Sequence, residues 1–552
     1  MDKTISQVPY SDGITENGDY DTKLFYRNDL LGASTPDPCV IYVPSDRDEG
    51  GYFYAYFTSI EYGIMRSTDL VNWEYVGKML QFEQGDWYTA GTCWAPDVRY
   101  NEADGKYYLY MTSKATEYMG EKDYELKNNY ADMHLSVAVA DSPCGPFKLY
   151  EGTNANGEVI TRNTPAFDFR KQRGEDYFTL DEGVIDAHLF VDGNGEKYLY
   201  FSSSDEKGGN CIYGVKMKDW VTPDYSTFKR LLRPGYAKVD ENKAFNEKGR
   251  SKILEAPWML TRDGRYYLGY SNGSFTSRLY SVFIATASSP LGPFERIKEE
   301  NDGSSLGIEY YHDHMGGTGH NTFLEYGGEV WNIYHAHKVR ATGSGNPRPI
   351  AIDKVEWIYN ETLGYDMPYT NGPTYSLQPL PSFVTGYKNI AKQASVKVTG
   401  KNQSGKEYLT DGIFTTKEVN AYREFTFDGK GKIELTFSEP KAVTAIMVYN
   451  SYYFDNAFLQ VDEIVLEVDK KPDGFLGKFD GNVSVKNLKF NPNYYRLMDE
   501  EDGESFMRPG GSALYQFKEM TVTKITVTVS KKLSKISDNE TIGISEITVL
   551  GK

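Results

Sequence analysis

The chain has 552 residues, too many for one ordinary hydrophobic core, so two or three domains are expected. Its 14% aromatic share, rich in tyrosine, and its 52 glycines favour an all-β protein with many turns. A net charge of −18 argues against a nucleic-acid partner, because phosphate binding depends on clusters of lysine and arginine. No apolar stretch reaches about 18 residues, so no membrane span is predicted.

Residues 1–20 are expected to be an N-terminal extension. They are polar and lack the apolar core of a signal peptide, which fits a cytosolic start or a mature end whose leader has been replaced by methionine. Four cysteines follow at irregular spacing: Cys39, Cys93, Cys144 and Cys211. This spacing indicates neither a metal site nor a disulfide scaffold. We interpret the cysteines as small buried hydrophobic residues, with one bridge as an option.

A turn followed by a strand recurs five times within residues 21–365. The copies are EGGYFYAYFTS (49–59), ADGKYYLYMTS (103–113), GNGEKYLYFSS (193–203), RDGRYYLGYSN (262–272) and YGGEVWNIYHA (326–336). A glycine-containing turn followed by alternating aromatic residues is typical of a hairpin, and a short apolar strand precedes each copy. Repetition at intervals of about 55 to 90 residues predicts a five-bladed β-propeller. The alternative, a β-sandwich with recurrent hairpins, would not repeat one unit in one register.

Polar residues open the strand that precedes each hairpin. Aligned on the turns, they are Asp37, Asp97, Asp186, Glu255 and His320. The first strand of a propeller blade lines the central channel, so we expect these side chains to converge at one end of the axis. Carboxyl groups at close range raise one another's pKa, which acid–base chemistry needs and a structural role rarely does. The alternative is that the acidic residues cap turns, and it stays open for Asp97 in particular.

Residues 25–365 resemble glycoside hydrolase family 43, five-bladed propellers that act on arabinose- or xylose-containing polysaccharides. Six motifs carry the resemblance in the family's order: TPDPCVIY, CWAPDVRY, VIDAHLFVDGNGEKYLYF, LEAPWMLTRDGRYYLGYS, GTGHNTF and RPIAIDKVEW. The resemblance implies an inverting hydrolysis with Asp37 as the general base and Glu255 as the general acid. Asp186 then raises the pKa of the acid and orients it. Inversion needs two carboxyl groups about 6.5–9.5 Å apart with a water between them.

The resemblance also implies contacts with the sugar. His320 is similar to a histidine that holds a calcium ion or an ordered water beneath the sugar, the alternative being an ordinary hydrogen-bonding histidine. Arg348 resembles an arginine that binds a sugar hydroxyl, the alternative being a surface arginine. His188, where relatives carry a different residue pair, is expected to point into the site. Asp97 is grouped with these substrate-binding residues.

Three aromatic residues, Trp94, Trp258 and Phe57, are expected either to form apolar walls against which a sugar stacks or to be core. The segment HDHMGGTGH (312–320) has three histidines in nine residues, a spacing that suggests a transition metal. A loop that contacts substrate is favoured, because Asp313 is its only acidic residue and no cysteine is near. The predicted chemistry requires no cofactor, and a structural calcium ion is the group that the resemblance allows.

From residue 366 the character of the sequence changes. Residues 366–387 are rich in proline, tyrosine and glycine and are expected to be a linker. Residues 388–552 alternate in short strands without the blade repeat, which predicts a jelly-roll β-sandwich. The motifs NIAKQASV, LTDG and ISEITVLG resemble discoidin-type domains, which include many carbohydrate-binding modules.

The role of this sandwich is left between two alternatives. The aromatic segments NSYYFDNAF (450–458) and FNPNYYRLM (490–498) are candidates for contact with a glycan. Otherwise the domain only supports the propeller. We interpret Asp411, in the LTDG turn, as capping that turn rather than binding calcium.

The predicted function is release of a pentose from plant polysaccharide or oligosaccharide. An α-L-arabinofuranosidase is placed first, a β-xylosidase second, and a galactan- or arabinan-cleaving hydrolase third. A propeller that only binds sugar and a retaining glycosidase or transferase are the alternatives from other classes. Because polysaccharides are degraded outside the cytoplasm, export to the periplasm or cell surface of a bacterium is expected, with the leader absent from this chain. A cytoplasmic location is the alternative.

Overall fold

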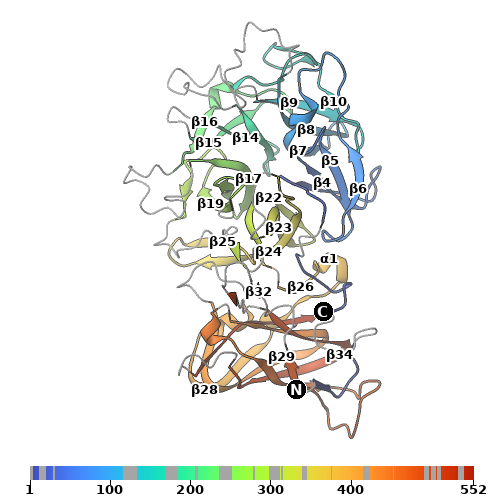
Figure 1. The fold of residues 1–552 in the computed structure, drawn as a ribbon, viewed down its shortest axis with the longest axis vertical. Coiled ribbons are helices and arrows are strands. Elements are labelled where there is room, and N and C mark those ends of the chain that lie inside the picture. Colours follow the sequence, from blue (N-terminus) through green and yellow to red (C-terminus); the bar gives the residue numbers. More distant parts are fainter. Residues whose placement is uncertain are drawn as a thin grey trace. The chain divides into compact units, whose positions relative to one another are not determined.

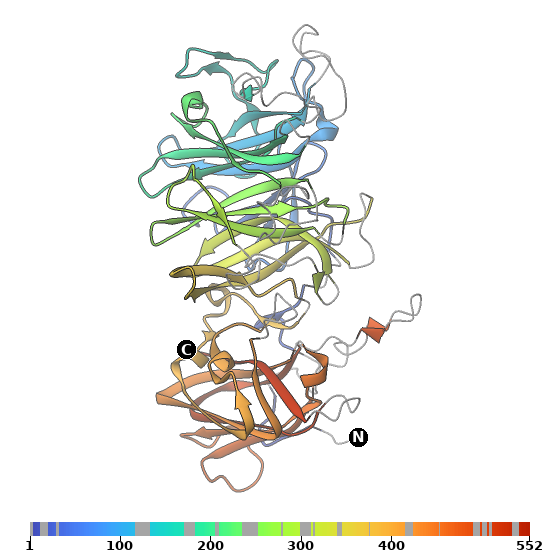
Figure 2. The ribbon, with the colours of Figure 1, turned by 90° about the vertical axis from the view of Figure 1, so that its left-hand side faces the viewer.

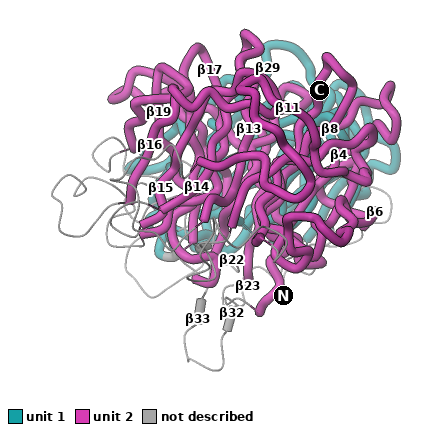
Figure 3. Tube along the Cα trace, turned by 90° about the horizontal axis from the view of Figure 1, so that it is seen from above, with its two compact units in different colours: residues 1–28, 374–552 teal, residues 29–373 magenta. Residues whose placement is uncertain are grey.

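The computed structural model describes residues 4–10, 20–28, 32–115, 133–169, 183–204, 209–234, 252–277, 280–297, 311–312, 315–338, 345–374, 376–414, 423–451, 453–489, 497–498, 505–506, 511–532 and 540–552. The chain divides into two compact units: residues 29–373 form one, and residues 1–28 with 374–552 form the other (Figure 3). Within these ranges the one α-helix is α1 (Ser382–Thr385). No helix in the described part of the chain has the length and apolar character that crossing a bilayer requires.

Five antiparallel sheets, each built from strands that follow one another in the chain, make up the unit of residues 29–373 (Figures 1 and 2). Blade one consists of β3 (Cys39–Val43), β4 (Tyr52–Phe57), β5 (Gly63–Ser67) and β6 (Glu74–Lys78), and blade two of β7 (Trp94–Asn101), β8 (Lys106–Lys114), β9 (Met133–Ala140) and β10 (Lys148–Leu149). Blade three consists of β13 (Ile185–Val191), β14 (Lys197–Ser204), β15 (Asn210–Met217) and β16 (Lys229–Leu232), and blade four of β17 (Leu254–Arg262), β18 (Arg265–Asn272), β19 (Ser281–Ala287) and β20 (Glu295–Arg296). Blade five consists of β22 (Met315–Tyr326), β23 (Glu329–Lys338), β24 (Ile350–Asn360) and β25 (Tyr365–Thr370). The short β21 (Tyr311–His312) extends the last sheet, and β11 (Gly152–Thr153) pairs with β12 (Val159–Ile160). The predicted five-bladed β-propeller is confirmed.

The alternating residues of the repeat fill the space between neighbouring blades. On β14, Tyr198 and Tyr200 pack in a cluster with blade-four residues, whereas Leu199 and Phe201 pack in a second cluster with blade-two residues. Successive side chains on a strand point to opposite faces, so both faces of this sheet are covered. The repeat is therefore apolar almost throughout, because a blade that lies between two others has no face in solvent.

A ring of five buried side chains links the inner strands of successive blades. Its members are Cys39, Asp97, His188, Trp258 and Thr322, which we call the closing ring. Each one bonds to the backbone of the next blade: Cys39 Sγ to Val98 N (3.4 Å), Asp97 Oδ2 to Leu189 N (2.8 Å), His188 Nε2 to Met259 N (3.1 Å), Trp258 Nε1 to Phe323 O (3.2 Å) and Thr322 Oγ1 to Val40 N (3.2 Å). The last bond joins blade five to blade one. No strand is shared across that seam, since each blade consists of consecutive strands.

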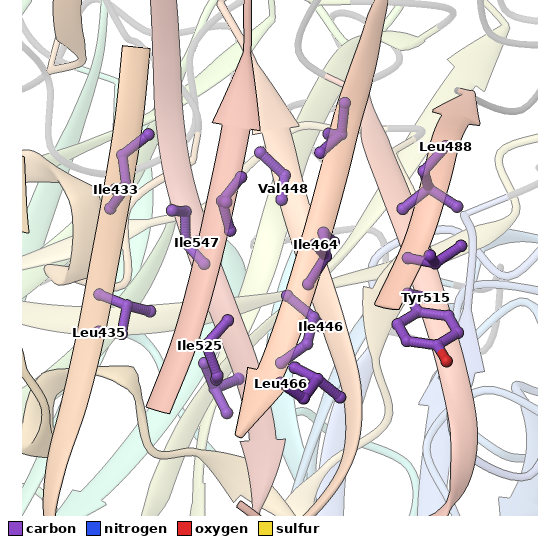
Figure 4. Packing of buried hydrophobic residues seen from close by; sticks show 14 of the residues in the cluster. Ile433, Leu435, Ile446, Val448, Ile464, Leu466, Leu488, Tyr515, Ile525 and Ile547 are labelled. Atoms are coloured by element: carbon purple, nitrogen blue, oxygen red, sulfur yellow. The ribbon is translucent and has the colours of Figure 1, made fainter. Parts of the chain in front are cut away.

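The unit of residues 1–28 and 374–552 is an eight-stranded β-sandwich. Its strands run in the order β1 (Ile5–Ser6), β31 (Asn482–Lys489), β30 (Gln460–Val468), β34 (Ser512–Val529), β29 (Phe425–Asn450), β35 (Thr541–Gly551) and β27 (Lys388–Asn389), with β28 (Ser395–Ser404) paired to β29. Buried residues two positions apart, such as Ile433 and Leu435 or Ile464 and Leu466, point into one core (Figure 4). Period-two burial is what a strand with one covered face produces.

Both chain segments that the sequence assigned to connections contribute strands. Within the expected N-terminal extension, β1 pairs with β31 of the sandwich. The expected linker (366–387) contains most of β25, which belongs to blade five, and also β26 (Gln378–Pro379), which pairs with β2 (Phe25–Tyr26). The four cysteines are free thiols, three of them buried and Cys144 half-buried.

Candidate active site

One residue near the start of each inner strand has a left-handed backbone. The five are Asp37 (φ 57°), Ala95 (φ 42°), Asp186 (φ 57°), Ala256 (φ 54°) and His320 (φ 49°). In blades two to five this residue lies inside a break in strand register, of the kind that a β-bulge produces. A non-glycine residue in this conformation costs about 1–3 kcal/mol, so five equivalent cases mark one strained rim of the propeller.

Side chains of the preceding blade hold this rim in place by accepting the backbone N–H groups of four of the five residues. Thr58 Oγ1 accepts from Ala95 (2.8 Å), Asp186 Oδ2 from Ala256 (3.1 Å), Ser271 Oγ from His320 (2.9 Å) and His335 Nδ1 from Asp37 (3.2 Å). The strain at these four positions is therefore offset by a hydrogen bond from a neighbouring blade, and the rim depends on assembly of the propeller.

The bulges change the register that was predicted for the five polar residues. Asp37, Asp186 and His320 are equivalent, since all three are the left-handed residue of their blade. Glu255 precedes the left-handed Ala256, and Asp97 lies two residues after the left-handed Ala95 in the closing ring. The prediction of a common register is therefore wrong for Glu255 and Asp97. Counting residues back from the hairpin turn cannot locate a bulge within the strand.

Asp37 is surrounded by groups that favour its ionised form. Its Oδ1 lies 3.0 Å from an Arg348 Nη1 and 3.3 Å from His320 Nδ1, and its Oδ2 accepts a 2.6 Å hydrogen bond from Thr58. Burial is the largest single influence and would raise the pKa of Asp37, but Arg348, then His320 and His335, together outweigh it, and the pKa lies well below the ordinary 3.8. Arg348 belongs to blade five, so the seam between the last and first blades completes the surroundings of this carboxylate.

Asp186 has the opposite electrostatic environment. Burial, then the charges of Glu255 and Asp37, raise the pKa of Asp186 well above 3.8. Glu255 is half-buried, and its Oε1 accepts a 2.7 Å hydrogen bond from the Tyr280 hydroxyl. The structure thus brings the three predicted carboxylates within electrostatic reach of one another. Asp186 and Glu255 together bind a proton more tightly than two isolated carboxyl groups would.

Two predicted substrate-binding residues lie in the closing ring with their polar atoms engaged by protein. Asp97 is 1% exposed, and its carboxylate pairs with Arg99 (2.7 Å) besides accepting from Leu189. His188 is 3% exposed, and burial lowers its pKa to about 4, so the ring is neutral. Its Nε2 accepts the Met259 N–H, so the proton of the neutral ring is on Nδ1, which lies 3.6 Å from the Asp97 carboxylate. These contacts stabilise the joint between blades two, three and four.

The three predicted aromatic walls are placed differently from one another. Trp258 is buried in the closing ring, where its ring lies 4.3 Å from that of His188 and beneath the Arg99 guanidinium. Phe57 is 5% exposed, and its ring occupies the space that a side chain at Gly63 would need. Trp94 is half-buried at the position that corresponds to Glu255. Of the three, Trp94 is the one whose position supports contact with a sugar.

Sequence reasoning missed Tyr280 and His335. The signal for His335 is present in the repeat: the position that is Thr58, Thr112, Ser202 and Ser271 in the first four copies is histidine in the fifth. The register of the strands confirms that these positions are equivalent, because each pairs with the residue just before the left-handed one. Tyr280 lies outside the repeated element, so no comparable signal identifies it.

The histidine-rich segment is only partly described. Asp313 and His314 lie outside the described residues, and of His312 the backbone alone is described. In the part of the chain that the structure describes, no three His, Cys, Asp or Glu residues are gathered as metal ligands. Calcium prefers six to eight oxygen ligands, whereas His320 offers nitrogen and its carboxylate neighbour Asp37 is engaged by Arg348. These residues do not fit direct coordination of calcium. The calcium ion that the sequence predicts near His320 remains a prediction.

Comparisons with known proteins identify the family of this chain. The family model for glycosyl hydrolases family 43 matches residues 26–363. A relative described as beta-D-galactofuranosidase xynD from Aspergillus niger is 27% identical over 301 residues, which cover 53% of this chain and 70% of that protein. Xylosidase/arabinosidase 43A from Humicola insolens is 27% identical over 285 residues, covering 47% and 70%. Among solved structures, a thermostable family-43 glycoside hydrolase is 23% identical with a TM-score of 0.48, covering 64% of this chain and 99% of that one.

Proposed function

Because the chain belongs to glycosyl hydrolases family 43 and is a glycoside hydrolase, we propose that it is an inverting enzyme that releases a terminal pentose. The observation that carries the proposal is the unequal treatment of the three carboxyl groups. The pKa of Asp37 is lowered beside Arg348, whereas burial and the neighbouring charge of Glu255 raise the pKa of Asp186. One ionised base and one protonated acid are what inversion requires at the same time.

Each side chain then has one task. Asp37 takes a proton from a water molecule as that water attacks the anomeric carbon. Glu255 gives its proton to the leaving oxygen, and the charge of Asp186 keeps that proton on the pair until the bond breaks. Arg348, half-buried beside Asp37, is placed to bind a sugar hydroxyl. The proposal uses only these side chains and water, and a calcium ion near His320 would be structural.

We place α-L-arabinofuranose first as the released sugar, then β-xylose, then cleavage of galactan or arabinan chains. The names of the relatives support this range, since one is a xylosidase/arabinosidase and another a β-D-galactofuranosidase. We further propose that plant-type polysaccharide or oligosaccharide is the substrate and that the enzyme acts after export.

A screen of aryl glycosides identifies the sugar. Purified protein is incubated with 4-nitrophenyl α-L-arabinofuranoside, β-D-xylopyranoside, β-D-galactofuranoside and β-D-galactopyranoside, and release of nitrophenol is measured. Glu255→Gln is the variant that lacks the acid. Glu325→Gln, the same substitution at the far end of β22, is the matched control. We expect one furanoside to be hydrolysed by wild type and control, with loss of about 10²–10⁴-fold in the Glu255 variant on an unactivated substrate.

Two other functions are tested by the same material. Equal hydrolysis by Glu255→Gln and wild type would show that Glu255 is not the acid, and binding of a sugar without hydrolysis of any glycoside by wild type would leave a propeller that only binds sugar. Proton NMR during early turnover separates inversion from retention, because an inverting enzyme first releases only the anomer opposite to that of the substrate. Release of the same anomer would overturn the assignment of Asp37 as a base.

A further inference from the structure

Tyr280 and His335 form a stacked pair between the two groups that carry the proposed chemistry. Both side chains are fully buried, with 0% exposure. Their ring centroids are 5.7 Å apart and their planes are 12° from parallel. Tyr280 immediately precedes β19 of blade four, and His335 is on β23 of blade five. The pair therefore crosses from the blade of Glu255 to the blade that faces Asp37.

Tyr280 fixes one oxygen of the acid. Its hydroxyl donates to Glu255 Oε1 at 2.7 Å. Burial raises the pKa of Tyr280 well above 10, so the phenol keeps its proton and remains the donor. The carbonyl oxygen of a protonated carboxyl group is its stronger acceptor, so this bond favours the acidic proton on the other oxygen. The proton that Glu255 delivers then lies on Oε2, in a fixed direction.

His335 fixes the backbone of the base. Its Nδ1 accepts the Asp37 N–H at 3.2 Å, and a nitrogen that accepts cannot also donate to the nearby carboxylate. Burial lowers the pKa of His335 to about 3, so the ring is neutral with its proton on Nε2. What His335 supplies to Asp37 is therefore a hydrogen bond that holds the left-handed backbone (φ 57°), and with it the direction of the carboxylate.

Gly319 leaves the space that the pair occupies. A Cβ at this position would lie 2.3 Å from the Tyr280 ring, closer than any real contact. The equivalent residue is Trp94 in blade two, Ile185 in blade three and Glu255 in blade four, so a side chain is normal here and its absence in blade five is specific. The backbone of blade five is thus shaped to seat Tyr280 against His335.

We propose that Tyr280 and His335 are a shared positioning unit, which sets the direction of the acid through Glu255 Oε1 and of the base through the Asp37 backbone. The inference rests on the proposed function. A misplacement of about 1 Å can cost a hydrolase about 10²-fold in rate, so a buried stack that contacts both groups has a direct effect on turnover without touching substrate.

The first test uses Tyr280→Phe, which keeps the stacked ring and removes only the hydroxyl. Positioning of the acid matters most when the leaving group is a poor one, and a dinitrophenolate leaves with little help. On the sugar identified by the screen, we expect kcat to fall about 10- to 100-fold on an unactivated oligosaccharide, with KM within about twofold, and to fall less than threefold on the 2,4-dinitrophenyl glycoside. An equal fall on both substrates, or no fall on either, would overturn the role assigned to Tyr280.

The second test compares two substitutions of His335. Asparagine presents an amide oxygen near the position of Nδ1 and can accept the Asp37 N–H, whereas leucine cannot. Water attack is needed whatever the leaving group, so His335→Leu is expected to lower kcat about 10- to 100-fold on both substrates, and His335→Asn to recover most of that loss. If the two variants were equally active, the hydrogen bond to Asp37 would have no positioning role.

A structural control and a reference separate the possible failures. Thr322→Val, in the same blade as His335, removes the closing-ring bond to Val40 of blade one, and we expect it to lower the melting temperature without any dependence of kcat on the leaving group. If Asp37→Asn and Glu255→Gln are inactive while the Tyr280 and His335 variants match wild type, the inference fails and the proposed function stands. If Asp37→Asn and Glu255→Gln retain full activity, the proposed function itself fails.

Discussion

The propeller and the sandwich each bury acidic side chains whose pKa is raised, yet the two clusters are built differently. In the sandwich, Glu546 is 0% exposed and burial, then the charge of Asp411, raises its pKa well above 4.5. Its two oxygens accept from Asn389 Nδ2 (3.0 Å) and Gly412 N (3.2 Å). Asp411 in turn accepts from Ile413 N and lies 3.0 Å from Arg423.

On the propeller rim, by contrast, two of the acidic side chains are partly exposed to solvent, and pKa values are shifted in opposite directions. Asp37 and Arg348 are half-buried, with side chains 12% and 14% exposed, and Glu255 is also half-buried. The pKa of Asp37 is lowered while that of its neighbour Asp186 is raised. A raised pKa alone therefore does not identify a site. What distinguishes the rim is that neighbouring carboxyl groups are driven in opposite directions beside a surface that solvent reaches.

The sandwich contacts also bear on its own predicted roles. Asp411 caps its turn by accepting the N–H of Ile413 two residues on, as expected for an aspartate in a turn. In the segment 450–458, Tyr453 is 41% exposed. In the segment 490–498 no side chain lies within the described residues. Contact with a glycan and support of the propeller both stay open as predictions for this unit.

The largest difference between the two acidic clusters is expected in the effect on kcat of substituting Asp37. Asp37→Asn keeps the size of the side chain and removes the base, so kcat should fall about 10³-fold, and the melting temperature should fall as well because Arg348 loses its charged partner. Asp411→Asn, the same substitution in the sandwich, should leave kcat unchanged. The measurement is hydrolysis of the best glycoside from the screen, alongside thermal unfolding. Residual activity above one tenth of wild type would show that another group activates the water.

A second substitution separates activity from stability. Asp186→Asn is expected to lower kcat about 10²-fold and to raise the melting temperature at neutral pH, because it removes a buried acid beside two others. The folded state raises this pKa, so the stability it contributes is full below the unfolded value near 3.8 and is lost as the pH rises towards the folded value. The gain in the variant should therefore be small near pH 4 and grow towards pH 7. A gain that is independent of pH would contradict the raised pKa.

Substitution of Arg348 is expected to shift the acidic limb of the pH profile of kcat/KM. Asp37 must be ionised to accept a proton, so the acidic limb of kcat/KM in the wild type should lie below its ordinary pKa of 3.8. In Arg348→Met, burial is no longer opposed by the guanidinium, and the limb should move to higher pH. Arg99→Met is the matched control, since Arg99 pairs with Asp97 in the closing ring. An unmoved limb in Arg348→Met would show that other groups keep Asp37 ionised.

The smallest effect is expected in the sandwich itself. Glu546→Gln should leave kcat within about twofold and alter only how stability depends on pH. A glutamate whose folded pKa is raised loses stability as the pH rises above about 4.5, and the amide has no proton to lose. Denaturant unfolding at pH 4.5 and 7.5 measures this slope. Should the slope be the same in the variant and the wild type, folding does not raise the pKa of Glu546.

The sequence by itself determined the number and order of the blades and pointed to the three carboxylates that the structure brings together. The turns and the alternation of apolar residues are local features, so a repeated hairpin can be read without any knowledge of the fold. Asp37, Asp186 and Glu255 were found because each stands beside a recurring strand. The same repeat marks His335, as the one histidine at a position otherwise held by threonine or serine.

The tertiary structure decided which polar residues reach the rim and what surrounds them. Because of the bulges in the inner strands, Asp97 lies two residues after the left-handed position. Asp97 and His188 therefore lie in the closing ring, where each bonds to the backbone of the next blade. Arg348 and His335 surround Asp37 where blade five meets blade one, although they are 311 and 298 residues away from it in the sequence. Such contacts follow from closure of the ring and not from local pattern, because a bulge and a seam are both set by hydrogen bonds to a neighbouring blade.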